Sequence, residues 1–213
     1  MFSWTTFDVT GMLPSGWQPD VLAVAAGSDD QAFPRTPVLS REAADVQHVT
    51  RGRVHAGQVV RGLPWLRELY RFQFRELAEQ ATSGEVYAAV DERYGTVLNV
   101  QRGRAMRFEC HVDSNPLTGL LFCTDHGPMA GGELVIAHSE AARSLAEIER
   151  ACSVIRPQAG HLIFFDGRDH PHYVRPLRAD AGLRVVAVMN YYTSSYPEST
   201  RPAVLNRHLY GDQ

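Results

Sequence analysis

Two hydrophobic patterns divide the chain, and the first predicts a long helix. Between residues 64 and 82, apolar side chains recur every three or four positions, the period of an amphipathic helix. Pro64 suits a first helical position, and Gly84 can end the helix. The stripe predicts a helix packed on the back of a sheet, and its members are Leu66, Tyr70, Phe74, Leu77 and Ala81.

The second pattern begins after Gly84 and is that of short strands. Apolar runs rich in β-branched and aromatic residues alternate with turn residues, which favours a β-sandwich or jelly roll. The runs cover residues 96–100, 106–112, 117–124, 132–137, 162–167 and 183–193. One helix is predicted among them, over 140–152, with Ser139 as N-cap. Its apolar stripe is Ala142, Leu145, Ile148 and Cys152.

The first 60 residues are rich in Gly, Pro, Ser and Asp, which predicts short strands and loops. One short helix is predicted after Ser40. We therefore expect a single domain over 1–213. Residues 1–84 form a helical and irregular support, 85–193 the catalytic core and 194–213 a tail.

Composition narrows the function classes. The 213 residues carry a formal net charge of −3, with 44% hydrophobic and 21% charged residues, typical of a globular protein. Such a balance argues against binding nucleic acid or an anionic membrane. Neither a signal peptide nor a transmembrane stretch is recognisable, so we expect a cytoplasmic protein, either a monomer or a homodimer.

The chain has no lysine, because all 21 basic residues are arginines. This excludes Schiff-base chemistry, pyridoxal-phosphate enzymes and lysine-dependent phosphate loops. The three cysteines, Cys110, Cys123 and Cys152, form no CxxC pair, so neither a disulfide framework nor a cysteine zinc site is predicted.

Candidate metal ligands lie at the end of one strand run, in the triplet His111-Val-Asp113. Residues i and i+2 of a strand share a face, which puts an imidazole beside a carboxylate. A second histidine from a later strand would complete a two-His, one-carboxylate set for Fe(II) with open positions. Strand periodicity leaves two candidates for it, His170 and His172.

A candidate anion anchor is Arg184, at the start of the apolar run RVVAVMNYY. A buried guanidinium is costly unless an anion meets it. A dicarboxylate would provide bidentate, charge-assisted hydrogen bonds. The structural alternative is a salt bridge to Glu133 or Asp166.

Over 96–193, a little under half of the chain, the sequence resembles the Fe(II)/2-oxoglutarate-dependent oxygenase superfamily, most closely its prolyl-hydroxylase-like branch. The matching stretches, in family order, are HVDSNP, LTGLLFCT, GGEL, IRPQAGHLIFFDG, HPHYVRPL and GLRVVAVMNYY. The resemblance implies a double-stranded β-helix, a jelly roll of cupin-like type, mainly β with flanking helices. It also implies that His111, Asp113 and His172 bind Fe(II) and that Arg184 holds the distal carboxylate of 2-oxoglutarate. His170 would then lie behind the metal, face the substrate or belong to a plain loop.

Two departures from the family pattern concern the co-substrate. Phe108 and Phe122 stand where the prolyl-hydroxylase branch often has tyrosines, and phenylalanine cannot hydrogen-bond a carboxylate. We therefore expect another polar side chain to assist Arg184, and the candidates are Asn99, Thr118 and Tyr191.

The resemblance implies a 2-oxoglutarate-dependent dioxygenase. Asp113 favours hydroxylation, since halogenating relatives have a small residue there. We expect it to oxidise an unactivated C–H bond of a small molecule, such as an amino acid or natural-product intermediate. The alternatives are a protein-residue hydroxylase of prolyl type, a cupin-like metal-binding module or isomerase without 2-oxoglutarate, and a zinc hydrolase.

Two further groups are candidates for substrate contact. His126 lies in a Gly/Pro loop, DHGPMAGG, and would either touch substrate or be solvated. The cluster Arg102, Arg104 and Arg107 would either contact an anionic substrate or form a solvated edge.

Overall fold

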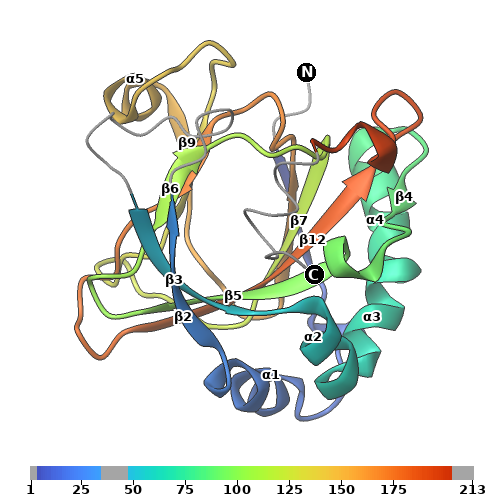
Figure 1. Cartoon of the computed structure of the whole chain (residues 1–213), viewed down its shortest axis with the longest axis horizontal. Helices are drawn as coiled ribbons and strands as arrows, with labels where there is room; N and C mark the ends of the chain where they lie inside the picture. Colours follow the sequence, from blue (N-terminus) through green and yellow to red (C-terminus); the bar gives the residue numbers. More distant parts are fainter. Residues whose placement is uncertain (1–3, 35–47, 203–213) are drawn as a thin grey trace.

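The computed structural model describes residues 4–34 and 48–202, which form two antiparallel sheets with helices outside them (Figure 1). The larger sheet has the order β1-β10-β7-β12-β5-β3-β2, and β4 pairs with β12. The smaller has the order β6-β11-β8-β9. This confirms the predicted mainly β class with a jelly-roll architecture.

The strands of the larger sheet, in spatial order, are β1 (Trp4–Asp8), β10 (His161–Phe165), β7 (Leu117–Phe122), β12 (Leu183–Tyr192), β5 (Thr96–Arg102), β3 (His48–Val54) and β2 (Asp29–Pro34), with β4 (Tyr87–Ala88) beside β12. Those of the smaller are β6 (Phe108–His111), β11 (His172–Val174), β8 (Leu134–Ala137) and β9 (Cys152–Ile155). The helices are α1 (Trp17–Ala26), α2 (Ala56–Gly62), α3 (Pro64–Arg71), α4 (Gln73–Thr82) and α5 (Leu145–Arg150), with 3₁₀ turns η1 (Thr10–Met12), η2 (Glu92–Tyr94) and η3 (Glu198–Thr200).

Strand periodicity in β12 separates two apolar cores. Odd positions such as Val185 and Met189 join the core between the larger sheet and helices α1–α4. Even positions such as Val186 turn inward, where they pack with residues of the smaller sheet. Any polar residue at an even position of β12 therefore faces the space between the sheets.

Two predicted helices differ from the structure. The helix over 64–82 is two helices, α3 and α4, because Phe72 leaves the helical region at φ −119° and ψ −88°. Phe72 is neither glycine nor proline, so the sequence carries no ordinary signal of this break. The helix over 140–152 is only α5, and its N-cap is Ser144, whose side chain accepts a hydrogen bond from the Glu147 amide.

The predicted stripe of that second helix nevertheless stays together. Ala142 and Ile148 are buried in one cluster beneath the outer face of the smaller sheet. Leu145 and Cys152 pack against this cluster, although Cys152 belongs to β9. The apolar pattern therefore indicates a buried surface correctly, but the prediction of one continuous helix is wrong.

The N-terminal segment contributes more to the sheet than its support role suggests, since β1, β2 and β3 all pair into the larger sheet. The helix predicted after Ser40 lies outside the described residues, as does the tail beyond residue 202. The domain boundary at residue 84 stays a prediction.

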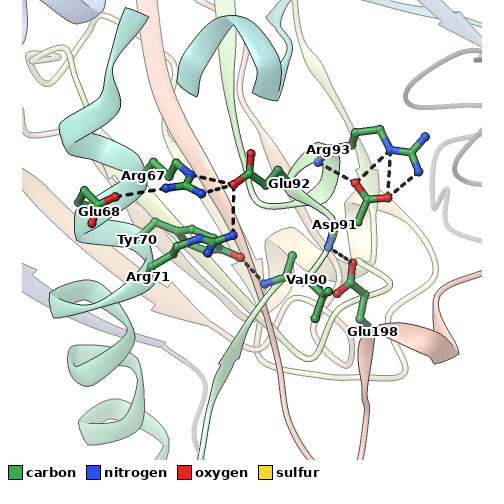
Figure 2. A network of polar contacts seen from close by, with 10 residues as sticks. Arg67, Glu68, Tyr70, Arg71, Val90, Asp91, Glu92, Arg93 and Glu198 are labelled. Carbon is green, nitrogen blue, oxygen red and sulfur yellow. Dashed lines mark hydrogen bonds and ion pairs between the residues drawn. The ribbon is translucent and has the colours of Figure 1, made fainter. Parts of the chain in front are cut away.

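A network of polar contacts ties α3 to the turn that precedes β5 (Figure 2). Arg67 and Arg71 both reach the same carboxylate oxygen of Glu92, at 2.5 and 3.2 Å. From η3, Glu198 accepts a hydrogen bond of 2.6 Å from the Val90 amide. The ion pairs are partly exposed and contribute at most about 1 kcal/mol each. They connect α3 and η3 to the turn that precedes β5.

Candidate metal centre

Three ligand-type side chains meet where the smaller sheet opens. His111 ends β6, Asp113 follows two residues later, and His172 opens β11 directly opposite His111 in the ladder. The Nε2 atoms of His111 and His172 lie 3.4 and 3.7 Å from the two carboxylate oxygens of Asp113. Adjacent ligands of one ion, each about 2.1 Å from it, are roughly 3 Å apart. The spacing therefore fits three neighbouring ligands of a single metal ion.

Backbone carbonyls fix the orientation of both imidazoles. His111 Nδ1 donates to the Glu109 carbonyl at 2.6 Å, and His172 Nδ1 donates to the His170 carbonyl at 3.1 Å. The Nε2 lone pair of each ring then faces Asp113, the arrangement of metal-binding histidines. The side chain of His170 is buried and hydrogen-bonds the Ala137 carbonyl instead. Of the two candidate histidines, only His172 is placed as a ligand.

The carboxylate of Asp113 is held in place by its neighbours. The backbone amide of Asp113 donates to the Gly167 carbonyl at 2.7 Å. Thr118 donates a hydrogen bond from its hydroxyl to Asp113 and accepts one of 2.9 Å from the side-chain Nδ2 of Asn115. Thr118 was a candidate to assist Arg184, but its hydroxyl is engaged on both sides in positioning Asp113.

The three groups shift each other's pKa. Burial raises the pKa of Asp113, but the two histidines and Thr118 lower it further, so it lies well below its usual value. Burial lowers the pKa of His172 to about 4. Burial also lowers the pKa of His111, but the hydrogen bond and charge of Asp113 outweigh it, and the net direction is upward.

These directions predict the pH dependence of metal binding. His172 is already neutral between about pH 5.5 and 8, whereas His111 must lose a proton to bind a metal below its raised pKa. Affinity should therefore fall about tenfold per pH unit on the acid side and be level on the alkaline side. Anaerobic calorimetry with Fe(II) over the same pH range measures this slope. A slope of two protons, or none, would contradict the assignment.

Removing the support of Asp113 gives a second prediction. Thr118→Val keeps the side-chain shape but deletes the hydroxyl, and loss of such an outer partner weakens metal binding by about tenfold or more. The same calorimetry tests it, with Thr200→Val on exposed η3 as the matched control. Equal affinities in the Thr118 variant and the wild type would show that the carboxylate needs no such support.

Arg184 occupies an inward-facing position of β12 and is 2% exposed. Its Nε and Nη2 atoms have no hydrogen-bond partner in the described part of the chain. Burial lowers its pKa to about 9, while the charges of Cys123 and Glu133 act in the opposite direction. Within the described residues it forms no ion pair with Glu133 or Asp166, so the structural alternative is not observed. A buried cation in this state is suited to bind an anion.

The three candidate metal ligands and Arg184 line one cavity between the sheets. Its walls are largely apolar, and Asn99 reaches it with a buried Oδ1 atom that lacks a partner among the described residues. Tyr191 was a candidate for the same role, but it occupies an odd position of β12. Its hydroxyl donates to the Tyr70 carbonyl at 3.0 Å in the helix-side core, so it cannot assist Arg184. The period-two pattern of β12 was a sequence signal against it.

The structure also places the other candidates for substrate contact. His126 is buried but does not line the cavity, because its ring nitrogens face the Gly131 and Leu183 carbonyls at 3.0 and 3.2 Å. Arg102 pairs with Asp30 outside the cavity, and Arg104 pairs with Asp180 at the surface. Arg107 is also absent from the lining. The sequence reasoning missed two arginines that do line the cavity, Arg51 and Arg53.

The donor set fits a non-haem iron centre. Two imidazoles and one carboxylate would hold a metal from one side, which is the ligand set of Fe(II) oxygenases. Within the described chain, no thiolate joins the group formed by His111, Asp113 and His172. The described cysteines are free, with Cys110 and Cys123 buried. A jelly roll with this set and a buried arginine in the same cavity fits the class of oxygenases that use iron and 2-oxoglutarate.

Residues 95–192, a little under half of the chain, match the sequence profile of the 2OG-Fe(II) oxygenase superfamily. This confirms the predicted superfamily, an enzyme class that uses Fe(II) and 2-oxoglutarate. Comparison with the sequences of curated proteins gives no match.

Several solved structures have a similar fold. The non-haem α-ketoglutarate-dependent epimerase SnoN from nogalamycin biosynthesis has 16% identity and a TM-score of 0.65, with 99% of this chain and 84% of that chain covered. AviO1 from Streptomyces viridochromogenes Tue57 has 19% identity and a TM-score of 0.63, covering 92% and 91%. A Trichoplax adhaerens prolyl hydroxylase, solved with a peptide fragment of hypoxia inducible factor, has 15% identity and a TM-score of 0.59, covering 92% and 86%.

Within the described ranges, every helix is too short or too polar to cross a membrane. The expected cytoplasmic location and the expected monomer or homodimer stay predictions.

Proposed function

We propose that this chain is a dioxygenase that hydroxylates or otherwise oxidises an unactivated C–H bond of a small molecule, such as an amino acid or natural-product intermediate. The observation that carries the proposal is one cavity that joins three metal-ligand side chains to a buried arginine, Arg184, whose Nε and Nη2 atoms lack partners in the described chain. Small-molecule chemistry is favoured by the likeness to SnoN and to the carbocyclase SnoK, both from nogalamycin biosynthesis, over nearly the whole chain.

His111, Asp113 and His172 hold Fe(II) in this proposal. Arg184 would hold the distal carboxylate of 2-oxoglutarate through charge-assisted hydrogen bonds, and this carboxylate would supply the anion that the buried guanidinium lacks. Asn99 is the remaining polar candidate to assist Arg184. When bound, iron and 2-oxoglutarate supply an oxidant by coupling decarboxylation of the keto acid to the reduction of dioxygen.

The apolar wall keeps the site dry and orients the substrate. Val97, Leu120, Val186 and Val188 line the cavity with no group that binds water. Exclusion of water protects the oxidant, and a fixed C–H bond near the metal decides the site of reaction.

The test is an anaerobic titration of Fe(II) into purified protein, with and without 2-oxoglutarate, followed by visible absorption. A charge-transfer band that needs both components is expected, because the keto acid chelates the metal. Normal metal binding without such a band would contradict the proposal and favour the cupin-like or hydrolytic alternatives.

Protein-residue hydroxylation is the second candidate, supported by the likeness to the Trichoplax prolyl hydroxylase. A measurement of succinate release distinguishes small-molecule oxidation from protein-residue hydroxylation. Free amino acids and natural-product intermediates should stimulate it under the proposal, whereas stimulation by peptides alone would favour the second candidate.

A further inference from the structure

A buried carboxylate that neither the metal centre nor the co-substrate uses lines the same cavity. It belongs to Glu109 of β6, which is 6% exposed. Its Oε2 atom is buried and has no hydrogen-bond partner in the described part of the chain. Glutamate is rarely buried without a partner, because a carboxylate that leaves water loses its hydration and gains nothing in return. A buried, unpartnered carboxylate oxygen beside a ligand cavity therefore points to a ligand.

A β-bulge explains why Glu109 lines the cavity. In the ladder between β6 and β11, His111 lies opposite His172 and Phe108 lies opposite Val174, so β6 has one residue more than β11 between these pairs. Phe108 packs in the core between the sheets, and regular alternation would turn the next residue outward. An extra residue changes this direction, as bulges near active sites often do. Glu109 thus lines the cavity together with its neighbour in sequence.

The other charged residues of the described lining already have a role or a contact. Asp113 belongs to the candidate metal centre, and Arg184 is assigned to the co-substrate. Three further arginines each make an interaction already, and these are Arg51, Arg53 and Arg201. Glu109 is therefore the carboxylate of the described lining that no other part of the site uses.

Charge balance favours a cation beside this carboxylate. Under the proposed function, Fe(II), the dianion 2-oxoglutarate, Asp113 and Arg184 together carry no net charge. These groups therefore leave the negative charge of Glu109 uncompensated. A protonated amine would supply both the N–H donors that Oε2 lacks and the opposite charge.

Glu109 also has a fixed relation to the metal centre. Its backbone carbonyl accepts the 2.6 Å hydrogen bond that orients His111. Two strand positions separate the two residues, a span of about 7 Å along the chain. A ligand bound to the Glu109 carboxylate would therefore begin a few bonds away from the metal and extend along the apolar wall toward it.

We propose that Glu109 recognises the substrate by binding its protonated amino group. This inference rests on the proposed function and specifies its substrate class. The substrate is a small molecule that carries an amine several bonds away from the carbon that is oxidised.

The experiment compares two probes of one shape, hexylammonium and hexan-1-ol, of which only the first is charged at neutral pH. Each is titrated by calorimetry into anaerobic protein saturated with Fe(II) and 2-oxoglutarate, at constant ionic strength. The wild type should bind the ammonium at least about tenfold more tightly than the alcohol, because it gains charge-assisted hydrogen bonds. Glu109→Gln should lose this preference, whereas Glu140→Gln, which neutralises an exposed carboxylate, should keep it.

Two results of these titrations would overturn the inference. Equal affinity for both probes in the wild type would mean that the cavity does not recognise an amine. A preference for the ammonium that Glu109→Gln retains would assign the amine to another group.

A thermal melt gives a third test, which depends on no probe. Glu109→Gln should melt at a temperature no lower than that of the wild type, since an amide costs less to bury than an unpaired carboxylate. A melting temperature several degrees lower would mean that the carboxylate has a structural partner in the protein, and would overturn the inference.

Failure of the proposed function gives a different result. In that case the wild type shows no charge-transfer band with Fe(II) and 2-oxoglutarate. Both probes are then titrated into protein saturated with Zn(II), in which Asp113 is occupied by the metal and cannot bind the amine itself. A preference for the ammonium that depends on Glu109 would support the amine site on its own, and the absence of this preference would overturn it.

Discussion

Arg184→Met should weaken 2-oxoglutarate binding by about a hundredfold or more while the protein still binds Fe(II). The reason is the loss of two charge-assisted hydrogen bonds, together worth roughly 3 kcal/mol or more. Methionine fills a similar volume without a charge, so the variant should unfold at a temperature no lower than that of the wild type. The measurements are the anaerobic charge-transfer titration for the co-substrate and a thermal melt for the fold.

Arg104→Met is the matched control, because Arg104 is an exposed arginine outside the cavity. It should change neither the 2-oxoglutarate titration nor the melting temperature by a measurable amount. If Arg184→Met binds 2-oxoglutarate as the wild type does, the distal carboxylate has another partner and the role given to Arg184 is wrong.

Gly167→Ala should lower metal affinity by about a hundredfold, although Gly167 is not itself a ligand. A Cβ here would lie 3.0 Å from the Asp113 carboxyl carbon and 2.9 Å from the Thr118 hydroxyl. The carboxylate must then rotate away from His111 and His172, and its bond to Thr118 breaks. Anaerobic Fe(II) calorimetry measures the loss.

Gly127→Ala provides the control, since a Cβ at Gly127 has nothing within 4 Å. It should bind Fe(II) as the wild type does. An unchanged Fe(II) affinity in Gly167→Ala would mean that the surroundings of the Asp113 carboxylate can shift to accommodate the added methyl group. The close approach of residue 167 to Asp113 would then not determine the metal geometry.

The grouping of the three candidate metal ligands could be predicted from sequence because each of them follows a short local rule. His111 and Asp113 are separated by two positions next to a strand, and the order of motifs selects His172. Arg184 stands out because a guanidinium at the head of an apolar strand is costly to bury unless an anion meets it. The six strands predicted after Gly84 all correspond to strands of the structure, because alternation and turn residues determine them locally.

The features that sequence reasoning missed have different causes. Arg51 and Arg53 lie in a segment of irregular composition, and only pairing between β3 and β5 brings them to the cavity. Thr118 is only five residues from Asp113, but its hydrogen bond to that carboxylate depends on how the loop between them turns into β7. The break at Phe72 arises without a local breaker residue, so periodicity alone could not find it.

The site is divided between two sheets, and this has a mechanical consequence. The candidate metal ligands belong to or adjoin β6 and β11 of the smaller sheet, whereas Arg184 belongs to β12 of the larger. Under the proposed function, a co-substrate bound at one end by the metal and at the other by Arg184 would connect the two sheets. Binding of the co-substrate should then change the exchange rates of the slowly exchanging amides in β6, β11 and β12 together. The reason is that the two sheets could separate only when the co-substrate is released.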